Sequence, residues 1–284
     1  MINIFVKTED HGKSYILKTN YVSVEFNREY DIVVNSSPER IVCHRISCNS
    51  NRVVDIRAFL SVVQSYIEHA SVYDLSSEGL TDFFHAIVRL FKVEVDKDSK
   101  TARQGLWGEL FLMKNFGGFD FWSEHWHADP LNMFDFSAVG KKVEVKTTLK
   151  PERIHAFSHG QLFSSEDVKI VSILLRNEDT GLSLKALIEE ARESFRNTAH
   201  YFKLEKAVRI ASMDGLDEEG PSFSESYARD NLAWFFVGHV PHFSCGEPEG
   251  VTSTHYSSDL TKAPRMTSNE VENWLSSWPT NKVQ

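Results

Sequence analysis

The sequence has few cysteines and no long apolar run. Its three cysteines are Cys43, Cys48 and Cys245. This odd number without a CxxC pair argues against a disulfide framework or a zinc site, and favours reduced thiols. No apolar run approaches the roughly 20 residues that a membrane-spanning helix needs. The apolar start, residues 1–7, is too short for a signal-peptide core and is soon followed by charges. We therefore expect a cytoplasmic protein that makes no contact with a membrane.

Several motifs of well-known enzyme classes are also missing. The sequence contains no Walker loop, no GxGxxG, no HExxH and no internal repeat. The net charge of -9 argues against non-specific coating of nucleic acid by the whole surface, although it permits a local basic strip. One segment, residues 135–153, has such an excess. Its five basic residues are Lys141, Lys142, Lys146, Lys150 and Arg153, against three acidic ones.

A chain of 284 residues with 41% hydrophobic and 25% charged residues is typical of a soluble globular protein of one large or two small domains. Residues 1–54 form a β-rich amino-terminal region of short strands, for which we expect a platform or partner-binding role. Residues 55–284 alternate between helical and strand periodicity, with a β-rich carboxyl-terminal extension. The pattern predicts a mixed α/β core.

Within this larger region, apolar residues recur at helical spacing over about 55–69, 77–91 and 100–115, with a charged linker at 94–100. The nearly continuous apolar run 168–176 predicts a buried central strand. A helix is expected from 181 to about 202, short strands at 207–211 and 233–240, and a small helix at 271–278.

The most informative stretch is residues 134–148, which predicts a β-hairpin. Residues 134–139 would form the first strand, 140–141 the turn and 142–148 the return strand. Because side chains alternate along a strand, Glu144 and Lys146 would share one face, with Asp135 on the paired strand. Two carboxylates supply oxygen ligands for Mg²⁺, and a bound ion can ionise water beside a phosphate. An exposed, solvated sheet face is the plainer interpretation of the same spacing.

The helix before this hairpin carries a further candidate, Glu109. Its neighbours are apolar, and a buried carboxylate is costly unless it is paired or binds a metal. A glutamate at the edge of the apolar stripe is the simpler alternative. Gly108 costs about 1 kcal/mol relative to alanine inside a helix, so we expect another backbone to approach it closely.

The order Glu109, Asp135, Glu144-x-Lys146 resembles the PD-(D/E)XK nuclease superfamily. Residues 105–110 (GLWGEL), 134–136 (FDF), 143–148 (VEVKTT) and 159–162 (HGQL) resemble more closely a bacterial family of PD-(D/E)XK motif proteins. The similarity covers most of the chain. One departure is Phe134, which stands where the motif has proline.

The resemblance implies a restriction-endonuclease-like core, a mixed sheet flanked by helices, and Mg²⁺ or Mn²⁺ as cofactor. Asp135, Glu144 and the Val145 carbonyl would hold the metal, Glu109 would complete the acidic cluster, and Lys146 would orient the attacking water. Gln161 would lie near the phosphate. The candidate nucleic-acid-binding residues are Lys141, Lys142, Lys150, Arg153 and His159.

The leading hypothesis is a Mg²⁺-dependent DNA endonuclease of a bacterial restriction or anti-phage defence system. A helicase or methyltransferase of the same system is a plausible partner, and double-strand cleavage would favour a homodimer. The main alternative is a catalytically silent, nuclease-like DNA-binding or scaffold subunit that acts through such a partner. RNA cleavage is a third hypothesis, since no feature of the sequence identifies a 2′-hydroxyl reader.

Overall fold

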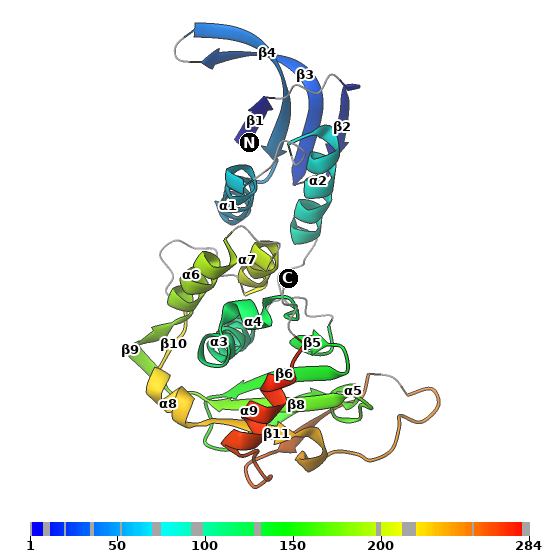
Figure 1. The fold of residues 1–284 in the computed structure, drawn as a ribbon, viewed down its shortest axis with the longest axis vertical. Helices are drawn as coiled ribbons and strands as arrows, with labels where there is room; N and C mark the ends of the chain where they lie inside the picture. Colours follow the sequence, from blue (N-terminus) through cyan, green and yellow to red (C-terminus); the bar gives the residue numbers. More distant parts are fainter. Residues whose placement is uncertain are drawn as a thin grey trace. The chain divides into compact units, whose positions relative to one another are not determined.

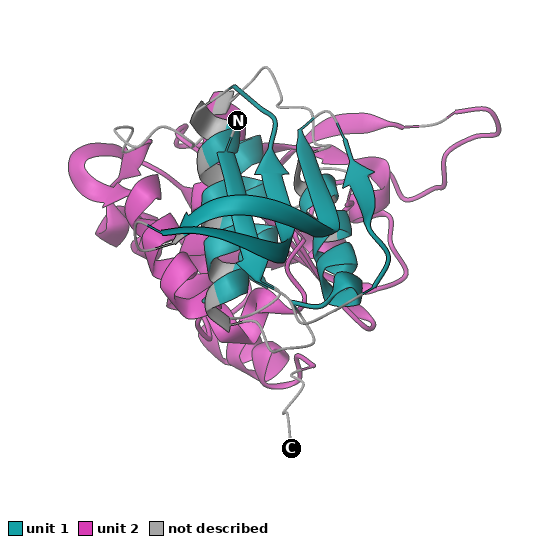
Figure 2. Ribbon diagram, turned by 90° about the horizontal axis from the view of Figure 1, so that it is seen from above, with its two compact units in different colours: residues 1–95, 196–216 teal, residues 96–195, 217–284 magenta. Residues whose placement is uncertain are grey.

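The computed structural model describes residues 2–7, 12–19, 21–34, 37–51, 53–69, 75–91, 99–127, 132–196, 200–211, 220–251 and 253–279. The expected linker at 94–100 falls almost entirely outside these ranges. The chain divides into two compact units (Figure 2). Unit 1 contains residues 1–95 and 196–216, and unit 2 contains residues 96–195 and 217–284. The expected domain boundary near residue 54 stays a prediction, but α1 and α2 belong by their contacts to the amino-terminal unit.

Unit 1 is an antiparallel sheet covered by helices (Figure 1). The sheet order is β1-β4-β3-β2, formed by Ile2–Lys7, Ser37–Cys48, Val22–Val34 and Tyr15–Lys18. Helices α1 (Val53–His69) and α2 (Ser77–Phe91) pack on one face, and α7 (His200–Ile210) packs against both helices.

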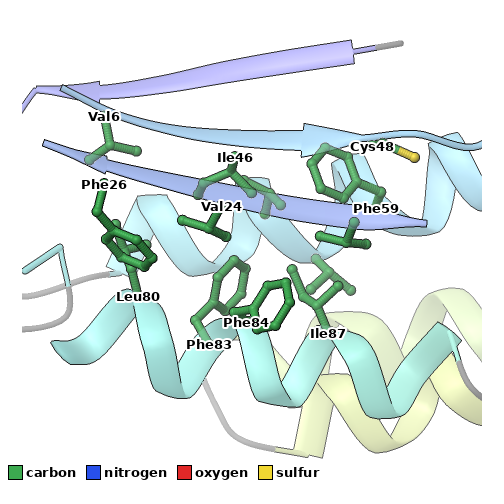
Figure 3. Close-up of a cluster of buried hydrophobic side chains, with 13 residues drawn as sticks. Val6, Val24, Phe26, Ile46, Cys48, Phe59, Leu80, Phe83, Phe84 and Ile87 are labelled. Atoms are coloured by element: carbon green, nitrogen blue, oxygen red, sulfur yellow. The ribbon is translucent and has the colours of Figure 1, made fainter. Parts of the chain in front are cut away.

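The core of unit 1 lies between the sheet and its helices (Figure 3). Alternate residues of the central strands, such as Val24, Phe26 and Ile46, point toward Phe59 of α1 and Phe83 of α2. All of these side chains are buried. The apolar faces that arise from the period of two in the strands and from the helical period in α1 and α2 therefore pack together in one layer.

Two predictions for unit 1 were wrong. Residues 207–211 were expected to form a strand but belong mostly to α7, where Arg209 forms a buried ion pair of 3.3 Å with Asp55 of α1. The amino-terminal region was also expected to contain only short strands. Residues 22–34 instead form the single long strand β3, because Asn27 (φ 50°) makes a bulge rather than an end.

Unit 2 is built on a mixed sheet of order β11-β8-β6-β5. The strands are Leu232–Phe236, Asp167–Leu174, Lys141–Thr148 and Phe136–Ala138. The β6 and β8 strands are parallel, and the other two pairings are antiparallel. The nearly complete burial of β8 confirms the expected central strand. The mixed α/β class is likewise confirmed.

Helix α3 (Ser99–Asn115) packs on one face of this sheet, beside α4 (Phe119–Ser123) and α6 (Leu184–Phe195). Two further strand pairs complete the unit: β7 (Ile154–Ser158) with β12 (His255–Asp259), and β9 (Asn177–Ser183) with β10 (Ser222–Phe223). The short helices are α5 (His159–Leu162), α8 (Glu225–Asp230) and α9 (Ser268–Ser276). None of the helices in the described ranges is long and apolar enough to span a membrane.

The hairpin of β5 and β6 is present with a small shift of its turn. Residues 139–140 form the turn, with Gly140 at a φ of 72°, whereas 140–141 was expected. Phe134 and Asp135 precede the first strand rather than belonging to it. Another backbone was expected to approach Gly108 of α3 closely, but its close neighbour is the Thr147 side chain of β6. A Cβ atom at position 108 would collide with the Thr147 Cγ2 atom.

Candidate active site

Glu144 and Lys146 of β6 lie in contact on one face of the sheet. The Lys146 ammonium Nζ is 2.6 Å from Oε1 of Glu144, and Glu144 is only 5% exposed. The intervening Val145 and the following Thr147 face the opposite side, toward Gly108 of α3. The strand therefore separates a charged pair from the apolar face that fixes its position.

Asp135 reaches β6 from the segment just before β5. Its Oδ2 atom accepts a hydrogen bond of 2.7 Å from the backbone N–H of Val145, which lies between Glu144 and Lys146. Burial and repulsion by the carboxylates of Glu144 and Glu109 raise the pKa of Asp135 well above its usual value. The hydrogen bond opposes this shift because it favours the charged form.

Glu109 joins the same group of charges from α3. Its Oε2 atom accepts a hydrogen bond of 2.7 Å from the indole N–H of Trp126. Its pKa is raised to about 7 in total. Burial and the charge of Glu144 raise the pKa, whereas the Trp126 hydrogen bond and the charge of Lys146 lower it. At neutral pH the Glu109 carboxyl is therefore divided between its protonated and ionised forms.

Glu144 is the most buried of the three carboxyl groups. Burial raises its pKa, whereas the Lys146 ammonium and the Gln161 side chain lower it. Its Oε2 atom is buried and has no hydrogen-bond partner within the described part of the chain. A buried carboxylate oxygen without a partner is energetically unfavourable, so a cation or hydrogen-bond donor bound to it would remove this cost.

These atoms suit a hard cation with few protein ligands. No group of three His, Cys, Asp or Glu side chains in the described ranges is placed to hold one metal ion. The contacts instead favour a two-carboxylate set, Asp135 and Glu144. Mg²⁺ commonly takes one or two carboxylates and keeps several waters, so the donor set fits this ion.

Gln161 lies beside this group through the structure of α5. Its Oε1 atom accepts from the backbone N–H of Ser158 at 3.0 Å, and its Nε2 atom donates to the carbonyl of Met133 at 2.7 Å. The first of these bonds and the Ser158 side chain form a capping box at the start of α5, and the second ties Gln161 to the segment before β5. The buried amide is therefore held in place next to Glu144.

The five candidate nucleic-acid-binding residues are in very different environments. Lys141 donates to the Trp274 carbonyl at 3.2 Å, and Lys142 forms an ion pair of 3.2 Å with Glu166. His159 is buried, with Nδ1 3.4 Å from the Tyr256 hydroxyl. Lys150 is exposed.

Arg153 is an internal residue, 1% exposed. Its guanidinium donates to the carbonyl and the hydroxyl of Ser172 at 2.6 and 2.9 Å, and to the Asn231 carbonyl at 2.7 Å. The structure does not place it at the surface beside Lys150. Its hydrogen bonds connect β8 and the loop before β11, so Arg153 stabilises the fold and is not available to bind nucleic acid.

Three neighbours of the charged group were not anticipated from the sequence. They are Trp126, which binds Glu109, and His155 and Phe157 on β7. The Lys146 ammonium lies 5.2 Å from the centre of the Phe157 ring. His155 accepts or donates a 2.8 Å hydrogen bond at Ser172, and burial with the nearby cations lowers its pKa to about 4. The alternation of residues 154–158 could have identified both β7 residues as inward-facing.

Comparison with known proteins gives one match. Residues 6–261 match the model of a family described as "Putative PD-(D/E)XK family member, (DUF4420)". The chain belongs to this family. Membership confirms the family resemblance of the motifs and agrees with a PD-(D/E)XK nuclease-like fold. No curated protein and no solved structure matches the chain. As a member of a PD-(D/E)XK family, the protein is nuclease-like, with nucleic acid as the implied substrate and divalent metal as the general cofactor of the superfamily.

Proposed function

We propose that the protein is a metal-dependent DNA endonuclease that hydrolyses phosphodiester bonds. The observation that carries the proposal is the meeting of Asp135, Glu144 and Lys146, which places two carboxylates and one ammonium around the Val145 peptide. The unpartnered Oε2 atom of Glu144 marks the point at which a further ligand would be stabilised.

Asp135, Glu144 and the Val145 carbonyl would hold Mg²⁺ or Mn²⁺. When bound, such an ion lowers the pKa of a coordinated water and stabilises negative charge on a phosphate. Electrostatics supports the assignment, because burial raises the pKa of both carboxyl groups, and repulsion by Glu144 and Glu109 raises that of Asp135 further. A cation would reverse that effect and favour both ionised forms.

The chain's own side chains would position the reactants. The Lys146 ammonium orients a water molecule toward the phosphorus atom and balances charge on the phosphate oxygens. Glu109, with a pKa of about 7, exchanges a proton near neutral pH, so its ionised form can accept a proton from the water as the water oxygen bonds to phosphorus. The P–O bond to one sugar oxygen breaks in the same reaction, and this leaving oxygen takes a proton from solvent. Gln161 fixes the orientation of Glu144 from α5.

DNA is the proposed substrate, and Lys150 is the exposed cation best placed in sequence to meet its backbone. Placement in a bacterial restriction or anti-phage defence system is supported by the family resemblance. On the same ground we propose a helicase or methyltransferase partner, and symmetric double-strand cleavage would use a homodimer.

The substrate assignment can be tested by incubating purified protein with end-labelled duplex DNA, single-stranded DNA and RNA of the same sequence. We expect cleavage of DNA in Mg²⁺ or Mn²⁺, and none in EDTA. Asp135→Asn should abolish it, whereas Asp230→Asn on exposed α8 is a matched change that should leave it unchanged. Cleavage of RNA alone, or full activity of Asp135→Asn, would refute the proposed function.

The second candidate, a nuclease-like DNA-binding or scaffold subunit, is favoured by one observation. Within the described ranges, no three His, Cys, Asp or Glu side chains are placed to hold one metal ion, so the site depends on two carboxylates. Calorimetric titration with Mn²⁺ separates the candidates. A nuclease should bind the ion and lose affinity in Glu144→Gln, whereas a scaffold subunit should bind DNA without saturable uptake of Mn²⁺ at this site.

A further inference from the structure

Unit 2 contains a pocket on the face of its sheet opposite Glu144 and Lys146. Trp234 of β11 pairs with Val171 of β8, which pairs with Val145 of β6. Directly paired residues share a face, so Trp234 lies on the face of Val145, opposite Glu144 and Lys146. The pocket lies at the β11 edge of this face, and it is separate from the proposed active site.

The pocket has the size and lining of a small-molecule site. Its volume is about 340 Å³, near the lower end of the range of roughly 300–1,000 Å³ for ligand pockets. Its apolar lining comes from β11, α9 and the segment after α3: Phe116, Leu232, Ala233, Trp234, Met266, Val271 and Leu275. The Phe116 and Trp234 rings lie 5.8 Å apart, edge to face.

One residue of the lining, Trp234, has an unsatisfied donor. Trp234 is 3% exposed, and its indole Nε1 is buried without a hydrogen-bond partner among the described residues. An indole N–H can only donate, so a ligand that satisfied it would have to present an acceptor atom. Ring nitrogens and carbonyls of planar heterocycles are acceptors of this kind.

The rim of the pocket is rich in guanidinium groups. Arg265 is exposed and forms no ion pair with any other described residue. Arg229 forms an ion pair of 2.6 Å with Glu225 and a hydrogen bond of 3.2 Å with Asn115. Burial lowers the pKa of Arg153, and the positive charge of the nearby Arg265 lowers it further. Glu272 is the one acidic residue lining the pocket. A phosphate at Arg265 would relieve the repulsion between cations.

We propose that this pocket binds a purine nucleoside monophosphate, with its base against Phe116 and Trp234 and its phosphate at Arg265. Aromatic walls suit a flat base, the buried indole N–H suits a ring acceptor, and the guanidinium suits a phosphate. The site is independent of phosphodiester cleavage, since no residue of the acidic group lines the pocket.

The proposal is tested by calorimetric titration of the full chain with AMP and GMP, beside adenosine and guanosine. We expect saturable binding of at least one nucleotide, about tenfold or more tighter than its nucleoside, since the phosphate would pair with Arg265. Arg265→Gln should weaken nucleotide binding about tenfold and leave nucleoside binding unchanged. Trp234→Phe should weaken both about fivefold, because it removes one hydrogen bond and keeps an aromatic ring.

Lys262→Gln is the matched control. It removes the same charge from an exposed residue close to Arg265 in sequence that does not line the pocket, and should leave affinity unchanged. Lys146→Ala should also bind AMP normally, which distinguishes this site from the proposed nuclease. The proposal is overturned by absence of saturable binding at millimolar nucleotide, by equal affinity for AMP and adenosine, or by equal weakening in Lys262→Gln and Arg265→Gln. Self-association of the chain that Arg265→Gln abolishes would also overturn it, because a second copy would then occupy the pocket.

Discussion

Replacing Glu109 with glutamine should stabilise unit 2 at alkaline pH. The Glu109 pKa is about 7 in the folded chain, against an ordinary value of 4.5. Between these values the folded state retains a proton that the unfolded state has released. The free energy of unfolding therefore falls as pH rises from about 4.5 to 7. Glutamine carries no charge and keeps an oxygen for the Trp126 N–H, so Glu109→Gln escapes this loss.

The size of the effect follows from the same two values. Each unit of pKa difference corresponds to about 1.4 kcal/mol, which sets a ceiling of ~3 kcal/mol above pH 7. Glu109 is partly exposed, and Lys146 stabilises its ionised form. We therefore expect Glu109→Gln to raise the free energy of unfolding by about 1–3 kcal/mol at pH 8, and by almost nothing at pH 4.

Tryptophan fluorescence during urea unfolding measures this change in unit 2 alone. All six tryptophans belong to this unit: Trp107, Trp122, Trp126, Trp234, Trp274 and Trp278. Glu152→Gln, at an exposed position, is the control and should change stability by less than about 0.5 kcal/mol. The reasoning would be refuted if Glu109→Gln were no more stable than the wild type at pH 8, or gained equally at pH 4 and pH 8.

Three further predictions concern the residues that support the site. Gly108→Ala should lower the free energy of unfolding by about 1–3 kcal/mol through its collision with Thr147. Adding Thr147→Ser removes the Cγ2 atom and should recover most of this loss in urea unfolding. If stability did not recover, the collision with Thr147 would not be the cause of the loss. Arg153→Gln should cost roughly 2–4 kcal/mol, because it strips buried acceptors of their donors. By contrast, Lys150→Gln should leave stability unchanged and reduce the number of ions released on DNA binding by about one. A loss of stability in Lys150→Gln and none in Arg153→Gln would contradict the surface role of Lys150 and the structural role of Arg153. His155, with a pKa of about 4, should remain neutral at pH 6 in an NMR titration, and titration near 6.5 would contradict its burial.

The elements with a clear period were predictable from the sequence. The buried run of β8 and the helical spacing of α3 and α6 identified most of the unit 2 core. The position of the hairpin turn was predicted to within one residue, because Gly140 is suited to the turn. Local patterns of this kind depend only on near neighbours in the chain.

Elements that depend on distant contacts were not predictable in this way. The segment around Arg209 has strand-like residues, but packing of α7 against α1 and the buried pairing with Asp55 stabilise it as a helix. The long strand β4 contains Pro38 and several charged residues, and its pairing with β1 and β3 compensates for this weak local preference. Return of residues 196–216 to unit 1 likewise leaves no signal in local sequence.

The candidate site shows the same contrast. Strand alternation predicted that Glu144 and Lys146 share a face, and motif order added Asp135; the three residues do meet. Arg153 was grouped with the surface cations by its place in a basic segment, although it is buried against Ser172 and Asn231. Charge composition does not reveal which side chains point inward.

The most direct test of the account is cleavage of supercoiled plasmid by the wild-type protein and by Lys146→Ala, in Mg²⁺ and in Mn²⁺. Lys262→Ala, at an exposed position with no proposed role in cleavage, serves as a matched lysine control. We predict that the wild type and Lys262→Ala nick or linearise the plasmid, and that Lys146→Ala loses at least about 100-fold in rate. Equal cleavage by the wild type and Lys146→Ala would contradict the assignment of this site. No cleavage by any of the three would contradict an autonomous nuclease and favour the partner-dependent subunit.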